Sequence, residues 1–94
     1  MENNNFEKIH GELPDVFREI KNSELAEVDK LAKAFEWMID RVLEHSQMDI
    51  ELARAMKDQE ALIREQIKHA VMKSAKGMFQ DCFRAVLGRK AWDV

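Results

Sequence analysis

The sequence has few of the residues that break helices or cross-link chains. In 94 residues it holds three glycines, one proline, one cysteine and no tyrosine. Sheet proteins need turn residues at short intervals, so this scarcity, with 46% hydrophobic and 35% charged residues, predicts an all-α fold. The single cysteine, Cys82, excludes an intrachain disulfide and a cysteine-based zinc cluster. A chain of this length forms one domain with a small core, and we expect self-association to supply part of its stability.

The sequence also lacks long apolar runs and a secretory signal. Residues 1–5, MENNN, are polar and acidic, whereas a secretory signal begins basic and continues apolar. No apolar run is long enough to predict a membrane-spanning helix. We therefore expect a cytoplasmic protein with a disordered segment at residues 1–5, one α-helical domain at residues 6–88 and a carboxyl-terminal tail at residues 89–94.

The spacing of apolar residues predicts the helices. Pro14 fits the first turn of a helix that starts near Leu13, because the missing N–H has no partner there in any case. Residues 24–45 follow Ser23, the expected N-cap, and carry the clearest periodicity in the chain. Their expected buried seam comprises Leu25, Val28, Ala32, Phe35, Ile39 and Val42. Residues 45–49 lack this periodicity and predict a tight turn, and residues 50–87 predict a long helix that ends at Gly88.

A turn near residue 47 divides the chain into arms of similar length, which predicts a long helical hairpin with a short amino-terminal helix. The second arm's expected buried stripe comprises Leu52, Met56, Ile63, Ile67, Ala70, Ser74, Met78 and Cys82. Its last turns are apolar on nearly all sides, which is typical of a helix buried on two sides. We expect two hairpins to pair as a homodimer of the four-helix-bundle type.

Arg64 and His69 form the one pair that resembles a catalytic motif. The stretch REQIKH resembles the shortest form of the Arg-x(4–6)-His motif of HEPN ribonucleases, which are small all-α proteins that often dimerise. The resemblance implies RNA cleavage by Arg64 and His69. On an unbroken helix, five residues rotate two side chains about 140° apart. The same spacing rules predict that Glu65 and His69 form an exposed pair four residues apart.

Other catalytic and metal sites lack their signatures. Glu36, Asp40 and Glu44 form a row of carboxylates, but di-iron bundles also need a Glu-x-x-His pair, which the sequence does not contain. There is no glycine-rich phosphate loop. Cys82 lies among apolar residues and is interpreted as a buried packing residue. We therefore predict a protein that is not an enzyme and that needs no metal or other cofactor.

Aromatic residues on unexpected faces predict the binding surface. Trp37 points away from the seam, in a column with Arg41 and Met48, and an exposed tryptophan usually has a partner. The predicted partner-binding residues are Trp37, Arg41, Met48, Met72, Phe79, Phe83, Arg84, Arg89, Lys90 and Trp92. The alternative is a more complex monomer in which the first helix covers Trp37 or Phe79.

The charge is uneven along the chain. Residues 1–63 hold 15 acidic and 8 basic side chains, whereas residues 64–94 hold 3 acidic and 7 basic ones. The basic arm can match the acidic arm or bind nucleic acid, but its cations are spread around the helix. We predict a protein that sequesters, scaffolds or inhibits a protein partner, with nucleic-acid binding as the alternative. Short acidic helical chains are common among phage and mobile-element accessory proteins that block host machinery, an association by type.

Overall fold

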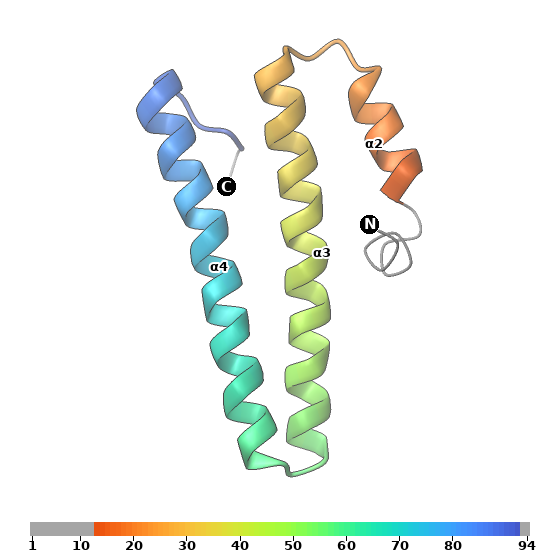
Figure 1. Cartoon of the computed structure of the whole chain (residues 1–94), viewed down its shortest axis with the longest axis vertical. Coiled ribbons are helices and arrows are strands. Elements are labelled where there is room, and N and C mark those ends of the chain that lie inside the picture. The colour runs from red at the N-terminus through yellow and green to blue at the C-terminus, as the bar shows by residue number, and fades with distance from the viewer. Residues whose placement is uncertain (1–12, 93–94) are drawn as a thin grey trace, which may run out of the picture.

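A computed structural model describes residues 13–92, which form three α-helices (Figure 1). These are α2 (Leu13–Lys21), α3 (Glu27–Ala55) and α4 (Gln59–Leu87). The prediction of an all-α fold is confirmed for this part of the chain, and α2 begins at Leu13 as predicted. The expected disorder of residues 1–5 and the last two residues of the expected tail lie outside the described residues.

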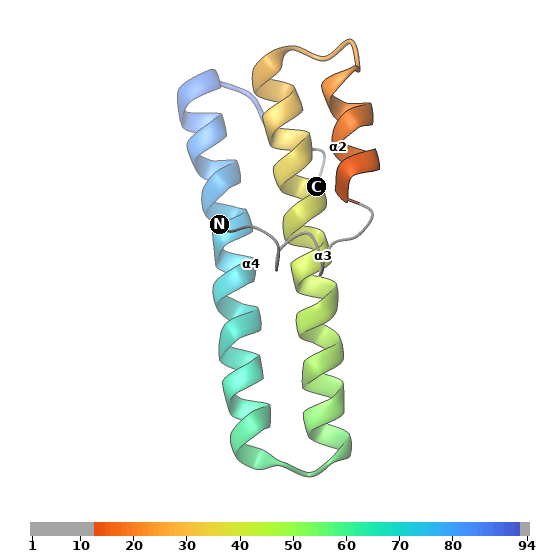
Figure 2. The ribbon, with the colours of Figure 1, turned by 45° about the vertical axis from the view of Figure 1, so that its right-hand side comes forward.

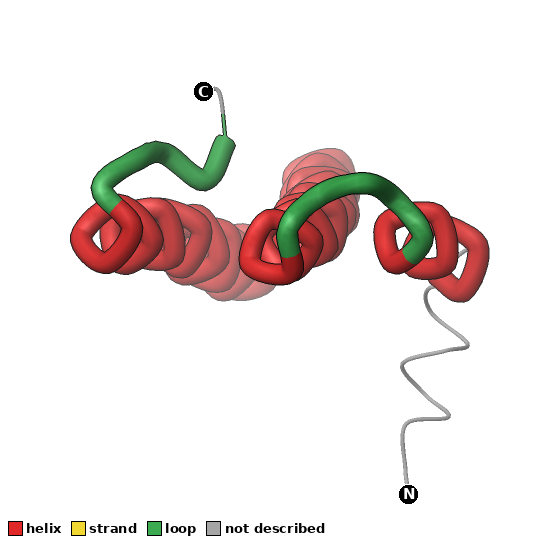
Figure 3. The backbone as a smooth tube through the Cα atoms, turned by 90° about the horizontal axis from the view of Figure 1, so that it is seen from above, coloured by secondary structure: helices red, strands yellow, loops and turns green. Residues whose placement is uncertain are grey.

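The three helices lie side by side in one layer. α3 and α4 run in opposite directions, and α2 packs on the other side of α3 (Figures 1 and 2). Seen from above in Figure 3, the helices form a row with α3 in the middle. One layer cannot enclose a core, so burial is confined to the contacts between elements. The buried apolar residues are Ala32, Ile39, Ile50, Ala53, Phe83 and Trp92.

The turn between the two long helices lies at residues 56–58, so the predicted turn at residues 45–49 is wrong. The N–H of Lys57 donates to the Arg54 carbonyl, and the N–H of Asp58 donates to the Ala53 carbonyl, each at 3.1 Å. This pair of bonds closes a helix in the Schellman arrangement. Lys57 has a left-handed φ of 58°. The end of α3 could not be located from the sequence because the left-handed position holds lysine, whereas a glycine there would have indicated it.

The other helix ends are set by local hydrogen bonds. The Asp58 side chain accepts from the N–H of Ala61 at 3.1 Å and caps α4. Gly88, with a φ of 72°, ends α4 as predicted. Ser23 does not cap α3, because its hydroxyl donates to the Ile20 carbonyl at 2.7 Å and so binds the end of α2. α3 starts only at Glu27, preceded by Ala26.

α4 turns toward α3 the side opposite to the predicted one. Ile63, Ile67 and Met78, expected to be buried, are 56%, 60% and 60% exposed, and Cys82 is exposed as well. The packed side instead carries Phe79 and Phe83. α4 is apolar on two sides. The aromatic side packs against α3 because it also carries His69 and Lys76, which contact Ser46 and Asp40 of α3. Periodicity alone could not choose between the two sides.

Candidate functional site

The carboxyl-terminal tail folds back onto the layer and inserts Trp92 between α3 and α4. Trp92 is 6% exposed, and its indole Nε1–H donates to the Ala32 carbonyl oxygen at 2.9 Å. Its ring stacks on Phe79 with centroids 5.3 Å apart, and Phe79 stacks on Phe35 at 4.5 Å. These rings form an aromatic cluster inside the chain, so Trp92 and Phe83, two of the predicted partner-binding residues, are buried within it.

Two polar contacts hold the tail in place. The Gln80 amide donates to the Trp92 carbonyl at 3.2 Å and accepts from the Ala91 N–H at 2.6 Å. The Arg89 guanidinium donates twice to the Asp29 carboxylate, at 2.8 and 3.1 Å. This hydrogen bond to Asp29 raises the pKa of Arg89, against a smaller lowering by desolvation. Gln80 therefore holds the tail to α4, and Arg89 holds it to α3.

Two cations lie over rings of the aromatic cluster. The Lys76 ammonium is 2.6 Å from Asp40 Oδ1 and 5.7 Å from the centroid of the Trp92 ring. The Arg89 guanidinium lies 5.2 Å from the Phe83 ring. The ammonium and guanidinium groups are attracted to the faces of these rings and also shield them from water.

Trp37 lies beneath α2 and is half-buried. Its ring meets Phe17 edge-on, with centroids 6.1 Å apart, and the Arg41 guanidinium lies 5.2 Å from it. The predicted exposed Trp37 column is therefore wrong for Trp37 itself. The structure matches the alternative in which the first helix covers this tryptophan, because Phe17 gives the ring an apolar contact within the chain.

The ten predicted contact residues do not form one surface. Phe79, Phe83 and Trp92 belong to the aromatic cluster, and Arg89 holds the tail. Trp37 and Arg41 lie near α2, Met72 is half-buried, and Met48, Arg84 and Lys90 are exposed. The surface that carries most exposed aliphatic residues was missed, because those residues were assigned to the core.

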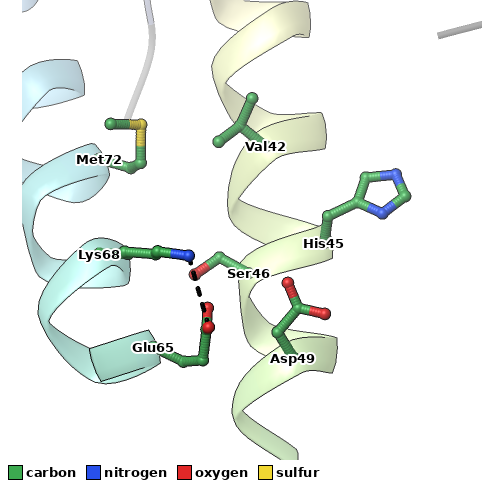
Figure 4. Close-up of a pocket in the computed structure, with 7 residues that line it drawn as sticks. All are labelled: Val42, His45, Ser46, Asp49, Glu65, Lys68 and Met72. Carbon is green, nitrogen blue, oxygen red and sulfur yellow. Dashed lines mark hydrogen bonds and ion pairs between the residues drawn. The ribbon is translucent and has the colours of Figure 1, made fainter. Parts of the chain in front are cut away.

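A groove of about 320 Å³ runs between α3 and α4 on the side of the layer away from the tail. It is lined by Val42, His45, Ser46, Asp49, Glu65, Lys68 and Met72. Figure 4 shows Glu65 and Lys68 reaching from α4 toward Ser46, while His45 points away from α4. The tail lies against Asp29, Lys33 and Glu36, which at about 100° per residue fall on the other side of α3.

The floor of this groove is polar. Ser46 is buried, and its hydroxyl lies 3.1 Å from His69 Nδ1. Glu65, whose side chain is 14% exposed, pairs with Lys68 at 3.4 Å and lies 3.8 Å from Arg64 Nε. Arg64 and His69 thus contact different groups, and nothing in this arrangement joins them at one reaction centre. Residues 45–49 were predicted to form a turn, so the pairing of Ser46 with His69 from inside α3 was missed.

Because α4 turns its aromatic side toward α3, two surfaces with apolar side chains remain exposed. The open face is the side of the layer that carries the groove. At about 100° per residue, the positions on this side are Leu31, Met38, Val42, His45, Asp49, Leu52 and Met56 on α3 and Arg64, Lys68, Val71, Ala75, Cys82 and Val86 on α4. The outer edge is the side of α4 away from α3, and it comprises Ile63, Ile67, Ala70, Ser74 and Met78. Leu31 on the open face is 65% exposed and Ile67 on the outer edge is 60% exposed, so both surfaces leave large apolar side chains in water.

Within residues 13–92, no group of three or more histidine, cysteine or carboxylate side chains could hold a metal ion. None of the helices described has both the length and the apolar character needed to cross a membrane. No protein-family model matches the sequence, and comparison with curated proteins and with solved structures finds no match either. Any functional inference therefore depends on the surfaces of the chain itself.

Proposed function

We propose that this chain is a non-enzymatic helical protein that acts by binding protein. Two α3–α4 hairpins pair as a dimer of the four-helix-bundle type, and the pair sequesters, scaffolds or inhibits a further protein. Inhibition of host machinery by a phage or mobile-element accessory protein is one form of this activity. The observation that carries the proposal is the exposed aliphatic surface of α3 and α4.

The outer edge supports binding of a helix from another protein. Ile63, Ile67 and Met78 recur at helical spacing and are all more than half exposed. The small residues Ala70 and Ser74 lie between them and allow a second backbone to approach. Soluble monomers seldom expose an aliphatic row of this length, because water contact with it is unfavourable. An amphipathic helix that buries its apolar side on this row is the recognition mode that such a surface fits.

The single layer supports dimerisation. α3 contacts α4 on one side and α2 on the other, which leaves both flat faces without a helical cover among residues 13–92. The tail occupies part of one face. A second layer from another copy gives the apolar residues of the open face the cover that a four-helix bundle provides.

The hydrogen bonds of the groove support a non-enzymatic role. Ser46 and His69 form a hydroxyl–imidazole pair, but Ser46 lies inside α3. Backbone N–H groups in the middle of a helix donate to the preceding turn, so none is available to stabilise an oxyanion. The backbone around Ser46 therefore offers no donor to a reacting group, and the Ser46–His69 bond is better suited to holding α3 and α4 in register.

The enzymatic alternative is tested with RNA. The parent protein and the variants Arg64→Ala and His69→Ala are incubated with single-stranded RNA, and their helical content is compared by circular dichroism. We expect no cleavage by any of the three. Cleavage by the parent that both variants lose while staying folded would overturn the proposal in favour of a HEPN-like ribonuclease.

The binding role is tested by capture from cells of the source organism, followed by mass spectrometry. The test variant carries Ile63→Glu and Ile67→Glu on the outer edge. The matched control carries Gln66→Glu and Lys73→Glu, which are exposed positions on another side of the same helix. We expect a protein that the parent and the control retain and the test variant loses. Equal capture by all three chains contradicts the proposal.

A further inference from the structure

The open face has an ordered distribution of charge along its length. Asp40 pairs with Lys76, and Ser46 pairs with His69 further down the layer, so these contacts give the register of α3 against α4. Asp49 lies one turn below Ser46 and shares the groove with Glu65, at the level between Arg64 and Lys68. On this face, therefore, the acidic position of α3 is level with two basic positions of α4.

The rest of the open face is mainly aliphatic. Leu31, Met38 and Val42 lie on α3 above Asp49, and Val71, Ala75, Cys82 and Val86 lie at the matching levels of α4. Leu52 and Met56 lie below Asp49, beside the turn. A partner must therefore offer aliphatic groups over most of the length and opposite charges at one level.

Arg64 and Lys68 can each contact a further carboxylate in addition to Glu65. Glu65 is shared by two cations, Lys68 at 3.4 Å and Arg64 at 3.8 Å. The cationic side chains are 62% and 60% exposed, so both can contact a further acidic group. Asp49 is exposed and projects on the same face.

A second copy can meet these requirements in one of the two symmetric stackings. A half turn about an axis parallel to the helices places its α4 over α3 at an unchanged level. Asp49 then meets the second copy's Arg64 and Lys68, and the aliphatic segments meet each other. A half turn about an axis across the helices places α3 over α3 upside down. Asp49 then meets either its own counterpart or an aliphatic segment, and both contacts are unfavourable.

The area also suits a stable dimer. α3 and α4 have 29 residues each, and at about 1.5 Å per residue each is about 43 Å long. Two adjacent helices, each about 10 Å wide, therefore present roughly 800 Å². This is about the area that each partner buries in a standard stable interface.

We propose that the open face binds the open face of a second copy, turned about an axis parallel to α3 and α4, so that Asp49 of each copy faces Arg64 and Lys68 of the other. This rests on the proposed function and gives its dimer an orientation. The groove residues Asp49, Glu65, Arg64 and Lys68 then form a polar layer between aliphatic layers, and such a layer fixes the register of a helical bundle.

The test is a charge exchange between two different chains. In the Asp49→Lys chain, each interface contact becomes cation against cations. In the Lys68→Asp chain, Asp49 meets a carboxylate in place of the Lys68 ammonium, and only Arg64 is left to attract it. We expect each variant alone to show a dissociation constant raised about tenfold or more. A mixture of the two variants restores opposite charges at both contacts and re-forms a dimer. An ion pair within one chain would not be restored by mixing.

The measurement is solution mass by light scattering over a range of concentrations, with native mass spectrometry to count each variant in the mixed dimer. The parent is expected to reach about twice the chain mass of 11.0 kDa. The control variants Glu51→Lys and Lys73→Asp reverse charges outside the open face and should leave the mass of the dimer unchanged. Circular dichroism verifies folding, and the pair Asp49→Arg and Arg64→Asp repeats the exchange if a first variant unfolds.

Three outcomes overturn the inference: a parent that stays monomeric, single variants that dimerise as the parent does, or a mixture that stays monomeric. The capture experiment on the outer edge distinguishes this failure from failure of the proposed function. A monomeric parent that still retains a protein through Ile63 and Ile67 leaves the binding role in place and removes only the dimer.

Discussion

The indole N–H of Trp92 donates a hydrogen bond to the carbonyl oxygen of Ala32, 60 positions earlier in the chain. Ala32 lies in the second turn of α3 and is itself buried. This bond and the stack of Trp92 on Phe79 tie the tail to both long helices. The tail is thus part of the folded unit, and it covers the end of the interface between α3 and α4 that is far from the turn.

Replacement of Trp92 should measure this contribution. Trp92→Ala removes the ring and the hydrogen bond and should lower the free energy of unfolding by about 3 to 5 kcal/mol. Trp92→Phe keeps an aromatic ring and leaves the Ala32 carbonyl without this donor, which should cost about 1 to 2 kcal/mol. Denaturant titration measures both, with Lys90→Ala as an exposed control. A Trp92→Ala chain as stable as the parent would show that the tail is undocked in solution.

The two described glycines should respond oppositely to the same substitution. Gly77 is helical and has open space where a Cβ would lie, so Gly77→Ala should raise the free energy of unfolding by about 0.5 to 1 kcal/mol. Gly88 has a left-handed φ of 72°, so Gly88→Ala should lower it by about 1 to 2 kcal/mol. Thermal unfolding of the two variants tests both predictions. A melting temperature that moves in the same direction in both would contradict the assigned backbone conformations.

Lys57 provides a test of the turn position. Its φ of 58° is strained for a residue with a Cβ. Lys57→Gly should therefore stabilise the protein by about 1 kcal/mol, because glycine adopts this conformation without the steric cost. Lys57→Ala is the control, since alanine keeps the Cβ and should bring no such gain. A gain from alanine equal to that from glycine would count against a left-handed residue at this turn.

Phe17 should determine whether α2 covers Trp37. In a Trp92→Phe background, Trp37 is the remaining tryptophan of two, so its emission can be followed alone. Phe17→Ala removes the ring that contacts it and should shift the emission to longer wavelength as water reaches the indole. Limited proteolysis at residues 22–26 should become faster, because α2 loses its main aromatic contact. Arg18→Ala, an exposed neighbour, should leave the emission and cleavage rate unchanged.

Much of the fold was predictable from local signals, and the errors have physical causes. The apolar periodicity and the scarcity of glycine and proline predicted helices, and Gly88 predicted the end of α4. The turn was misplaced because Lys57, a residue without a turn preference, occupies the left-handed position. Ser46 was placed in the predicted turn at residues 45–49, but it lies inside α3 and its hydroxyl has His69 of α4 as a partner. Such a pairing across 23 positions leaves no periodic signal.

The candidate surface was less predictable than the helices. Ile63 and Ile67 form a good apolar stripe, and so do Phe79 and Phe83, so the pattern of α4 fits two opposite orientations. Sequence reasoning assigned the aliphatic stripe to the core and the aromatic one to partners. The structure instead packs the aromatic side against α3 and leaves the aliphatic stripe exposed, because Phe35, Trp92, Asp40 and Ser46 supply matching groups for the aromatic side alone.

The sequence by itself determined that this chain is helical, where α2 begins and α4 ends, and that α4 carries more apolar surface than one contact can bury. These properties depend on backbone preference and on spacing along one helix, which are local. Only the tertiary structure decided which side of α4 meets α3, that Trp92 returns to Ala32, and that the aliphatic residues remain in water. These features depend on how well side chains distant in the sequence pack against each other, and the spacing of residues along one helix carries no information about that packing.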